Sequence, residues 1–201
     1  MLFFVVRIND YNHTIFVNFI YTEKIIKRSV KMKILNEILI VGRPIIKSEA
    51  FADCMQIRHH KNTTIAQHMI NVTVTCLKIS NFLESKGFKI DRKRLILASI
   101  SHDLAMAHAK ELYGFSGYFT TAFRHPIDSF KIAQKICDIH EKTSKAITRH
   151  MWPLCIVPPN CIEGWILTIA DKYIAIQELF HKEKIYEIKK INFLKKPVTS
   201  D

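Results

Sequence analysis

From residue 32 onward, apolar residues recur at the three- and four-residue spacing of helices that bury one face. Ser48 and Asp91 can each cap the start of a helix. Either Thr63 or Thr64 can open a long helix between these two. Pro126 suits the first turn of a further helix. The predicted helices cover roughly residues 33–41, 48–59, 64–85, 92–101, 126–139, 141–150 and 162–182. This pattern predicts an all-α fold.

Other segments depart from the helical pattern. Residues 108–124 hold glycines and a run of small and aromatic residues, which is typical of a loop, and a second loop is expected at 152–161. The basic segment 58–61 is expected to be a solvated turn. Residues 1–31 include two short β-prone stretches and fit poorly with the helical segments after them, so Met32 is an alternative start of the native protein. We therefore expect an N-terminal extension, a helical domain and a basic C-terminal tail at residues 1–31, 32–185 and 186–201.

The composition suits one soluble domain. With 201 residues and 48% hydrophobic content, the chain can bury a sizeable core. No apolar run approaches the roughly 20 residues that a membrane-spanning helix needs, so we expect no membrane association. The 5 cysteines form no Cys-x-x-Cys pair, which indicates reduced thiols and a cytoplasmic location.

The chain is basic, with a formal net charge of +12 when histidine is counted as neutral. Several lysines cluster near the C-terminus, where a solvated tail is the simplest interpretation. A net positive field would also attract an anionic substrate. Because the sequence has no RNA-binding signature and no zinc-finger spacing, nucleic acid is not an expected partner, and nucleic-acid binding is the weakest of the functions considered.

Four residues place polar side chains inside apolar segments. His102 and Asp103 stand side by side in LILASISHDLAMA, and Asp171 interrupts GWILTIADKYIAI. His68 lies on the apolar stripe of its predicted helix. A buried carboxylate without a nearby cation is costly, and a divalent metal ion would stabilise it. Taken alone, His68 could be a hydrogen-bonded core histidine, and His102 with Asp103 could be a hydrogen-bonded pair at a helix end.

Two more histidines, His125 and His150, stand at predicted helix boundaries, where a side chain can point into a shared cavity. The six candidate ligands are therefore His68, His102, Asp103, His125, His150 and Asp171. Imidazole and carboxylate ligands suit Mn²⁺, Fe²⁺, Ni²⁺ or Zn²⁺. The lack of thiolates among the six argues against a structural zinc site.

The order of the six candidate ligands resembles the H…HD…H…H…D pattern. This is a longer version of the H…HD…D pattern of the HD-domain metal-dependent phosphohydrolase superfamily. The segments FRHP, ITRHMWPL and IADKY are similar to those of a group of small bacterial HD-domain proteins. The resemblance covers roughly residues 48–181 and implies an HD-domain helical bundle with two metal ions.

The resemblance also implies an activity and a division of the ligands. The first divalent metal ion would be held by His68, His102, Asp103 and Asp171, and the second by Asp103, His125 and His150. A metal-activated hydroxide would then attack phosphorus in line. The implied enzyme is a metal-dependent phosphoric ester hydrolase. It would cleave a phosphomonoester or phosphodiester in a small phosphorylated substrate, with a nucleotide as the first expectation.

The sequence departs from several HD groups at the position three residues after the paired aspartate. Those groups have Lys or Glu there, whereas this chain has Met106. We expect His108 and Lys110 to replace the missing acid or phosphate contact, next to Asp103 as the central catalytic residue. The Gly-Tyr-Pro motif of cyclic-dinucleotide phosphodiesterases is absent, which argues against those substrates.

Three further residues are candidate substrate contacts. Arg124 could bind a phosphate in a bidentate manner, or it could be an ordinary surface arginine. Lys172 could do the same, although adjacent helix positions point about 100° apart, which predicts that it does not face Asp171. Trp152 could stack on a nucleobase, or it could pack against the core or a loop.

Two other functions stay open. Some HD-fold proteins use the same six-ligand set for oxygen chemistry, so a di-iron oxygenase is one alternative. A non-catalytic module that binds a nucleotide is the other. No feature of the sequence predicts an oligomeric state.

Overall fold

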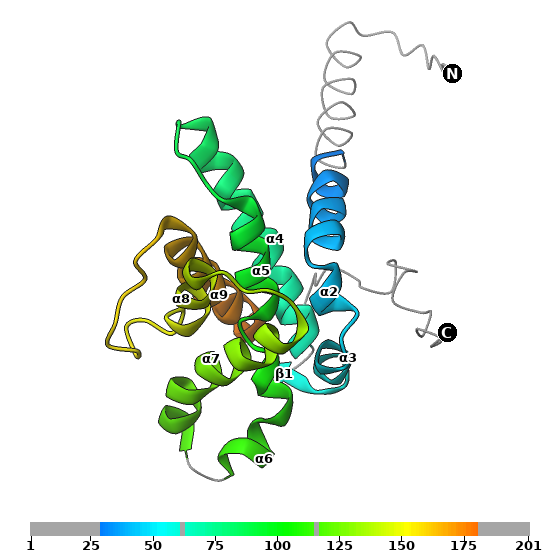
Figure 1. Cartoon of the computed structure of the whole chain (residues 1–201), viewed down its shortest axis with the longest axis vertical. Coiled ribbons are helices and arrows are strands. Elements are labelled where there is room, and N and C mark those ends of the chain that lie inside the picture. Colours follow the sequence, from blue (N-terminus) through cyan, green and yellow to red (C-terminus); the bar gives the residue numbers. More distant parts are fainter. Residues whose placement is uncertain (1–28, 61–62, 115–116, 181–201) are drawn as a thin grey trace, which may run out of the picture. The chain divides into compact units, whose positions relative to one another are not determined.

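The computed structural model describes residues 29–60, 63–114 and 117–180 (Figure 1). Contacts divide the chain into two units, Met1–Glu37 and Ile38–Asp201. In the first unit the described residues, 29–37, are helical, and residues 38–41 of the second are helical too. The β-prone stretches predicted near the N-terminus, and most of the predicted C-terminal tail, lie outside the described residues.

The second unit is mostly helical in the part that the structure describes, which confirms the all-α prediction. Its elements follow in the order α2 (Arg43–Ile46), α3 (Glu49–Gln56), β1 (Arg58–His60), β2 (Thr63–Thr64), α4 (Ile65–Ser85), α5 (Arg92–Ser101), η1 (Leu104–His108), α6 (Ala109–Tyr113), α7 (Gly117–Ile136), α8 (Glu141–Thr148) and α9 (Ile162–Phe180). Helix α4 packs most extensively against α5 and α9, and α7 packs against η1 and α8 (Figure 1). No helix in these described residues combines the length and the apolar character needed to cross a bilayer.

Helix α4 begins with a reciprocal cap that the sequence signals. The hydroxyl of Thr64 accepts a hydrogen bond from the Gln67 backbone amide at 3.2 Å. The Gln67 side-chain oxygen accepts one from the Thr64 backbone amide at 2.8 Å. Two amides that the helix itself cannot satisfy are thus bonded. Below this cap, Val72 and Cys76 are fully buried, so the predicted inward stripe is confirmed along the first part of α4.

Helix α5 forms the centre of the core. Asp91 caps it as predicted, because its carboxylate accepts from the Arg94 backbone amide at 2.9 Å. Every residue from Leu95 to Ser101 is buried. This agrees with the absence of charged residues between Arg94 and His102.

The predicted end of α3 is wrong. Ser48 caps the helix as expected, with its hydroxyl accepting from the Phe51 amide at 3.2 Å. The helix stops at Gln56, however, because Ile57 is extended, with a φ of −95° and a ψ of 128°. The next residues form β1, which pairs antiparallel with β2. Residues 58–60 of the basic segment therefore form a strand and not a turn, and the pairing with β2 holds them close to the start of α4.

The prediction of a loop at 108–124 is also wrong. This segment contains α6 and the first part of α7, which begins at Gly117. Pro126 lies inside α7 and not in its first turn. Glycine and proline disfavour a helix in isolation, but packing of α7 against η1 and α8 outweighs that local preference. Gly114, with a φ of +58°, ends α6 in a conformation that favours glycine.

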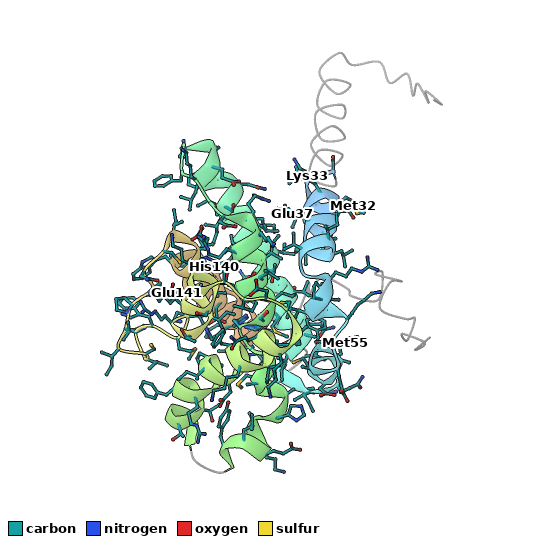
Figure 2. The ribbon with its side chains drawn as sticks, in the orientation of Figure 1. Met32, Lys33, Glu37, Met55, His140 and Glu141 are labelled. Atoms are coloured by element: carbon teal, nitrogen blue, oxygen red, sulfur yellow. The ribbon has the colours of Figure 1, made fainter. Side chains whose placement is uncertain are left out.

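Helix α8 begins at the surface. The ring of His140 accepts a hydrogen bond from the Lys142 backbone amide at 3.2 Å and so caps the helix. Figure 2 marks His140 and Glu141 at this end of α8. His140 itself is exposed.

Replacing Thr64 with alanine tests the cap of α4. We expect Thr64→Ala to lower the free energy of unfolding by about 1 kcal/mol, because the Gln67 amide loses its acceptor. Urea unfolding followed by circular dichroism measures this change. Thr64→Ser retains the hydroxyl and should stay close to the wild type. An alanine variant as stable as the serine variant would show that the cap contributes nothing.

Candidate metal centre

The fold brings the six candidate ligands together in the core. His68 lies near the start of α4, and His102 and Asp103 directly follow the last residue of α5. The remaining three come from the middle of α7, the end of α8 and the middle of α9: His125, His150 and Asp171. All six are buried, and none is more than 9% exposed. Burial at this level excludes ordinary solvation of the two carboxylates.

Asp103 occupies the middle of the cluster and presents its two oxygens to two different pairs of histidines. Its Oδ2 lies 3.5 Å from Nε2 of His102 and 3.9 Å from Nε2 of His68. Its Oδ1 lies 3.2 Å from Nε2 of His125 and 3.7 Å from Nε2 of His150. The carboxylate therefore faces two groups of ligand atoms. We call the group around His68 and His102 the His68 pocket, and the group around His125 and His150 the His150 pocket.

Asp171 belongs to one of these pockets only. Its Oδ1 lies 3.1 Å from Nε2 of His68 and 3.6 Å from Nε2 of His102. The His68 pocket thus contains two carboxylates, from Asp171 and Asp103. The ligand atoms of His68, His102 and Asp171 lie within 4.8 Å of one another, a spacing compatible with a shared metal ion.

In all four histidines, Nδ1 is hydrogen-bonded to a protein oxygen outside the cluster of ligands. Three of them donate Nδ1–H to backbone carbonyls at 2.7–2.8 Å: His102 to Ser99, His125 to Thr121 and His150 to Ile147. The fourth, His68, contacts the carboxylate of Glu178 at 2.9 Å. A carbonyl oxygen only accepts, so these bonds fix the tautomer and aim Nε2 at the centre of the cluster.

The centre contains polar atoms without a suitable protein partner. His125 and His150 face each other through their Nε2 atoms at 3.2 Å, although Nδ1 holds the proton in each ring. Nε2 of His102 and Oδ1 of Asp103 are buried and make no hydrogen bond. Two nitrogens bound to one ion, each about 2.0–2.1 Å from it, lie roughly 3 Å apart. The donor set therefore fits divalent cations, and a cation would remove the repulsion between the facing lone pairs.

The two carboxylates are ionised. Burial by itself would raise the pKa of Asp103, but the nearby rings of His102 and His125 hold it well below the usual range. The same balance applies to Asp171, whose pKa is lowered by its contacts with His102 and His68. The cluster thus contains two negative charges that bound cations would neutralise.

The histidines respond differently on the two sides of Asp103. Burial lowers the pKa of His150 to about 3, so this ring stays neutral. Burial also disfavours the charged form of His68, but the carboxylates of Asp171 and Glu178 outweigh it and raise the pKa to about 10. Burial also disfavours the charged form of His102, but Asp103 and Asp171 outweigh it and raise the pKa of that ring as well. In the chain alone, His68 and His102 are thus the rings that favour a proton beside the carboxylates. A divalent cation can replace that proton.

Lys172 lies closer to the site than the sequence suggests. Its ammonium donates to the carbonyl of His150 at 3.0 Å and lies 4.0 Å from Oδ2 of Asp171. The prediction that Lys172 does not face Asp171 is therefore wrong, because its long side chain reaches back across the helix surface. Burial lowers the pKa of Lys172, and the carboxylate of Asp171 opposes that shift.

The predicted catalytic residues after η1 have their described contacts elsewhere. His108 bonds through Nε2 to Asp53 at 3.2 Å and through Nδ1 to Glu111 at 3.3 Å. Lys110 is exposed on α6. The contacts described for these two residues include none of the six candidate ligands, and their catalytic role stays a prediction.

The other predicted substrate contacts also pack locally. The guanidinium of Arg124 lies over the ring of Tyr113, 5.6 Å from its centre. Trp152 meets Trp165 edge to face, with ring centres 5.1 Å apart. These contacts favour packing roles, and substrate binding by Arg124 or Trp152 stays a prediction.

Two residues of the site were not predicted from the sequence. His59 in β1 places its ring 4.6 Å from that of His68, and the ligand atoms of His59, His68 and Asp103 lie within 4.8 Å of one another. Its basic, polar surroundings in the sequence gave no signal of this. Glu178 lies seven residues after Asp171, two helical turns along the same face, and that spacing could have identified it.

Comparison with known proteins gives one match. The family model described as "HD domain" matches residues 65–176, which include all six candidate ligands. No curated protein and no solved structure matches the chain.

The geometry of Asp103 predicts which substitutions remove which ions. We expect wild-type protein equilibrated with Mn²⁺ to hold two ions per chain. Asp103→Ala should lose both, because both oxygens face ligands. Asp171→Ala should lose only the ion of the His68 pocket. Elemental analysis measures these ratios.

His140→Gln is the matched control, since His140 is an exposed histidine at the start of α8. It should bind metal as the wild type does. Equal metal content in the wild type and in Asp103→Ala would mean that the cluster is held by hydrogen bonds alone.

Proposed function

Because the chain belongs to the HD-domain family, which includes metal-dependent phosphohydrolases, we propose that it is a metal-dependent hydrolase of phosphate esters. The proposed substrate is a small phosphorylated molecule, and a nucleotide is the first candidate. The bond cleaved is a phosphomonoester or a phosphodiester.

One observation carries this proposal: Asp103 turns one oxygen toward the His68 pocket and the other toward the His150 pocket. The six candidate ligands would hold two divalent ions in these pockets, with Asp103 shared between them. Such ions supply Lewis acidity toward a phosphoryl group and toward the water that attacks it.

The side chains of the cluster support this role in two ways. Nδ1 of each histidine is already bonded, so the rings need no reorientation when a cation or a transition state forms. The six candidate ligands include two carboxylates, so two divalent ions would make the centre positive overall. A positive, buried centre favours an anionic substrate.

Lys172 supports a contact with the substrate at the edge of the centre. Its ammonium is held by the His150 carbonyl next to Asp171, while its side chain remains 37% exposed. An ammonium in this position can donate to a phosphate oxygen without leaving the site. We propose Lys172, not Arg124 or Trp152, as the first protein contact of the phosphate.

Hydrolysis of generic esters tests the reaction class. With Mn²⁺ added, wild-type protein should release nitrophenol from p-nitrophenyl phosphate or from its bis-ester. Asp103→Ala should lower kcat/KM by at least about a thousandfold, because metal ions contribute several kcal/mol to such reactions. His140→Gln should retain full activity.

Oxygen consumption is recorded in the same preparations. An iron-loaded wild type that consumes oxygen but cleaves neither ester would favour the oxygenase alternative. A stable complex with a nucleotide and no turnover would favour a binding module.

The role of Lys172 has its own test. Lys172→Met should raise KM for the cleaved ester by at least about tenfold, because a charge-assisted hydrogen bond contributes roughly 1.5–3 kcal/mol. Its metal content should stay that of the wild type. The control is Lys131→Met, which removes an exposed lysine on α7. If both variants have the wild-type KM, Lys172 does not contact the substrate.

A further inference from the structure

Glu178 lies behind the metal centre, on the face of α9 that meets α4. Its side chain is only 6% exposed. Both carboxylate oxygens are engaged by side chains of β2 and α4: Oε2 by Thr63 at 3.4 Å and His68 at 2.9 Å, and Oε1 by Asn71 at 3.1 Å. All three contacts are hydrogen bonds that an ionised carboxylate can accept: from the Thr63 hydroxyl, from Nδ1–H of His68 and from the Asn71 amide.

This contact makes His68 different from the other histidines. The other three are backed by neutral carbonyls within their own segments, whereas His68 is backed by a charged carboxylate from another helix. A charged acceptor forms a stronger hydrogen bond than a neutral one. It also makes the opposite ring nitrogen a more basic ligand.

The two pockets therefore differ in charge. Each pocket shares Asp103, but only the His68 pocket has Asp171 beside its histidines and Glu178 behind one of them. Each pocket also has two candidate-ligand histidines with Nε2 aimed at the same carboxylate, and the ring of His59 lies beside His68 as a further histidine of the His68 pocket. The asymmetry thus comes from the carboxylates of α9.

We propose that Glu178 is a positioning residue that aims Nε2 of His68 and makes the His68 pocket the tighter of two divalent-cation sites. The carboxylate restricts rotation of the ring and adds negative charge behind it. The inference rests on the metal centre of the proposed function and not on the identity of the substrate. It assigns a role to a residue that lies just beyond the family match, which ends at residue 176.

The test is calorimetric titration of metal-free protein with Mn²⁺, in the absence of any substrate. The wild type should show a tight and a weaker site. Glu178→Gln keeps the size of the side chain and removes its charge. It should weaken the tight site by about 10- to 100-fold and leave the weaker site within about twofold.

Combining Glu178→Gln with a variant that disables one pocket shows which pocket holds the weakened site. His150→Ala should leave only the His68 pocket to titrate, and Glu178→Gln should weaken that remaining site by the same factor. In Asp171→Ala, where the His150 pocket remains, Glu178→Gln should change nothing. If Glu178→Gln instead weakens the site that remains in Asp171→Ala and leaves the one in His150→Ala unchanged, the inference is overturned.

Glu163→Gln is the matched control. Glu163 is another buried glutamate of α9, and it bonds the Asp91 amide at 2.8 Å and Arg94 at 3.1 Å. Its loss should reduce stability but leave both affinities within about twofold. If Glu178→Gln behaves in the same way, Glu178 is a structural residue and the inference is overturned.

Glu178→Asp covers the case in which Glu178→Gln does not fold. It keeps the charge but withdraws the carboxylate from His68 by one methylene, so the tight site should still weaken. An unchanged tight site would overturn the inference.

Ester hydrolysis, measured separately, distinguishes a failure of this inference from a failure of the proposed function. A wild type with asymmetric sites and no hydrolysis counts against the proposed function alone, and an active wild type whose Glu178→Gln form binds normally counts against the inference alone.

Discussion

The structure depends on two carboxylates that are buried among helices. Asp103 and Asp171 are removed from water, and a buried charge is tolerated only when it is paired and hydrogen-bonded. In the chain alone, histidines supply that pairing, and the carboxylates raise the pKa of both His68 and His102. The packing of α4, α5 and α9 places these groups in contact. The same packing that forms the core thus also creates a centre that favours cations.

Sequence patterns predicted the fold where local and tertiary preferences agree. Thr64 and Asp91 have the right side chains for caps, and an uncharged run marks α5 as buried. The pattern failed where the two preferences conflict. Gly117 and Pro126 disfavour a helix locally, yet α7 runs through both because it packs against η1 and α8. The strand β1 was missed for a similar reason, since its partner β2 follows within a few residues and no alternation of polar and apolar residues announces it.

The candidate ligands could be found from the sequence because each is polar in a segment that is otherwise apolar or at a helix boundary. That signal exists only for residues in such surroundings. His59 stands among other basic residues, so nothing separates it from a solvated turn. Glu178 lies near the polar end of α9, where a glutamate is expected at the surface. Lys172 was misjudged because helix geometry places a Cβ atom, whereas a long side chain places its charge several ångströms away.

The origin of the ligands in five separate segments has a consequence for the amount of folded protein. The six candidate ligands are spread from residue 68 to residue 171, so the unfolded chain has no preformed site. A cation that binds only the folded state stabilises it by mass action, by about 2.7 kcal/mol at a free concentration 100 times the dissociation constant. The free metal concentration would then determine both the fraction of molecules that is active and the fraction that stays folded and resists proteolysis. At a low metal concentration, the amount of protein would fall along with its activity.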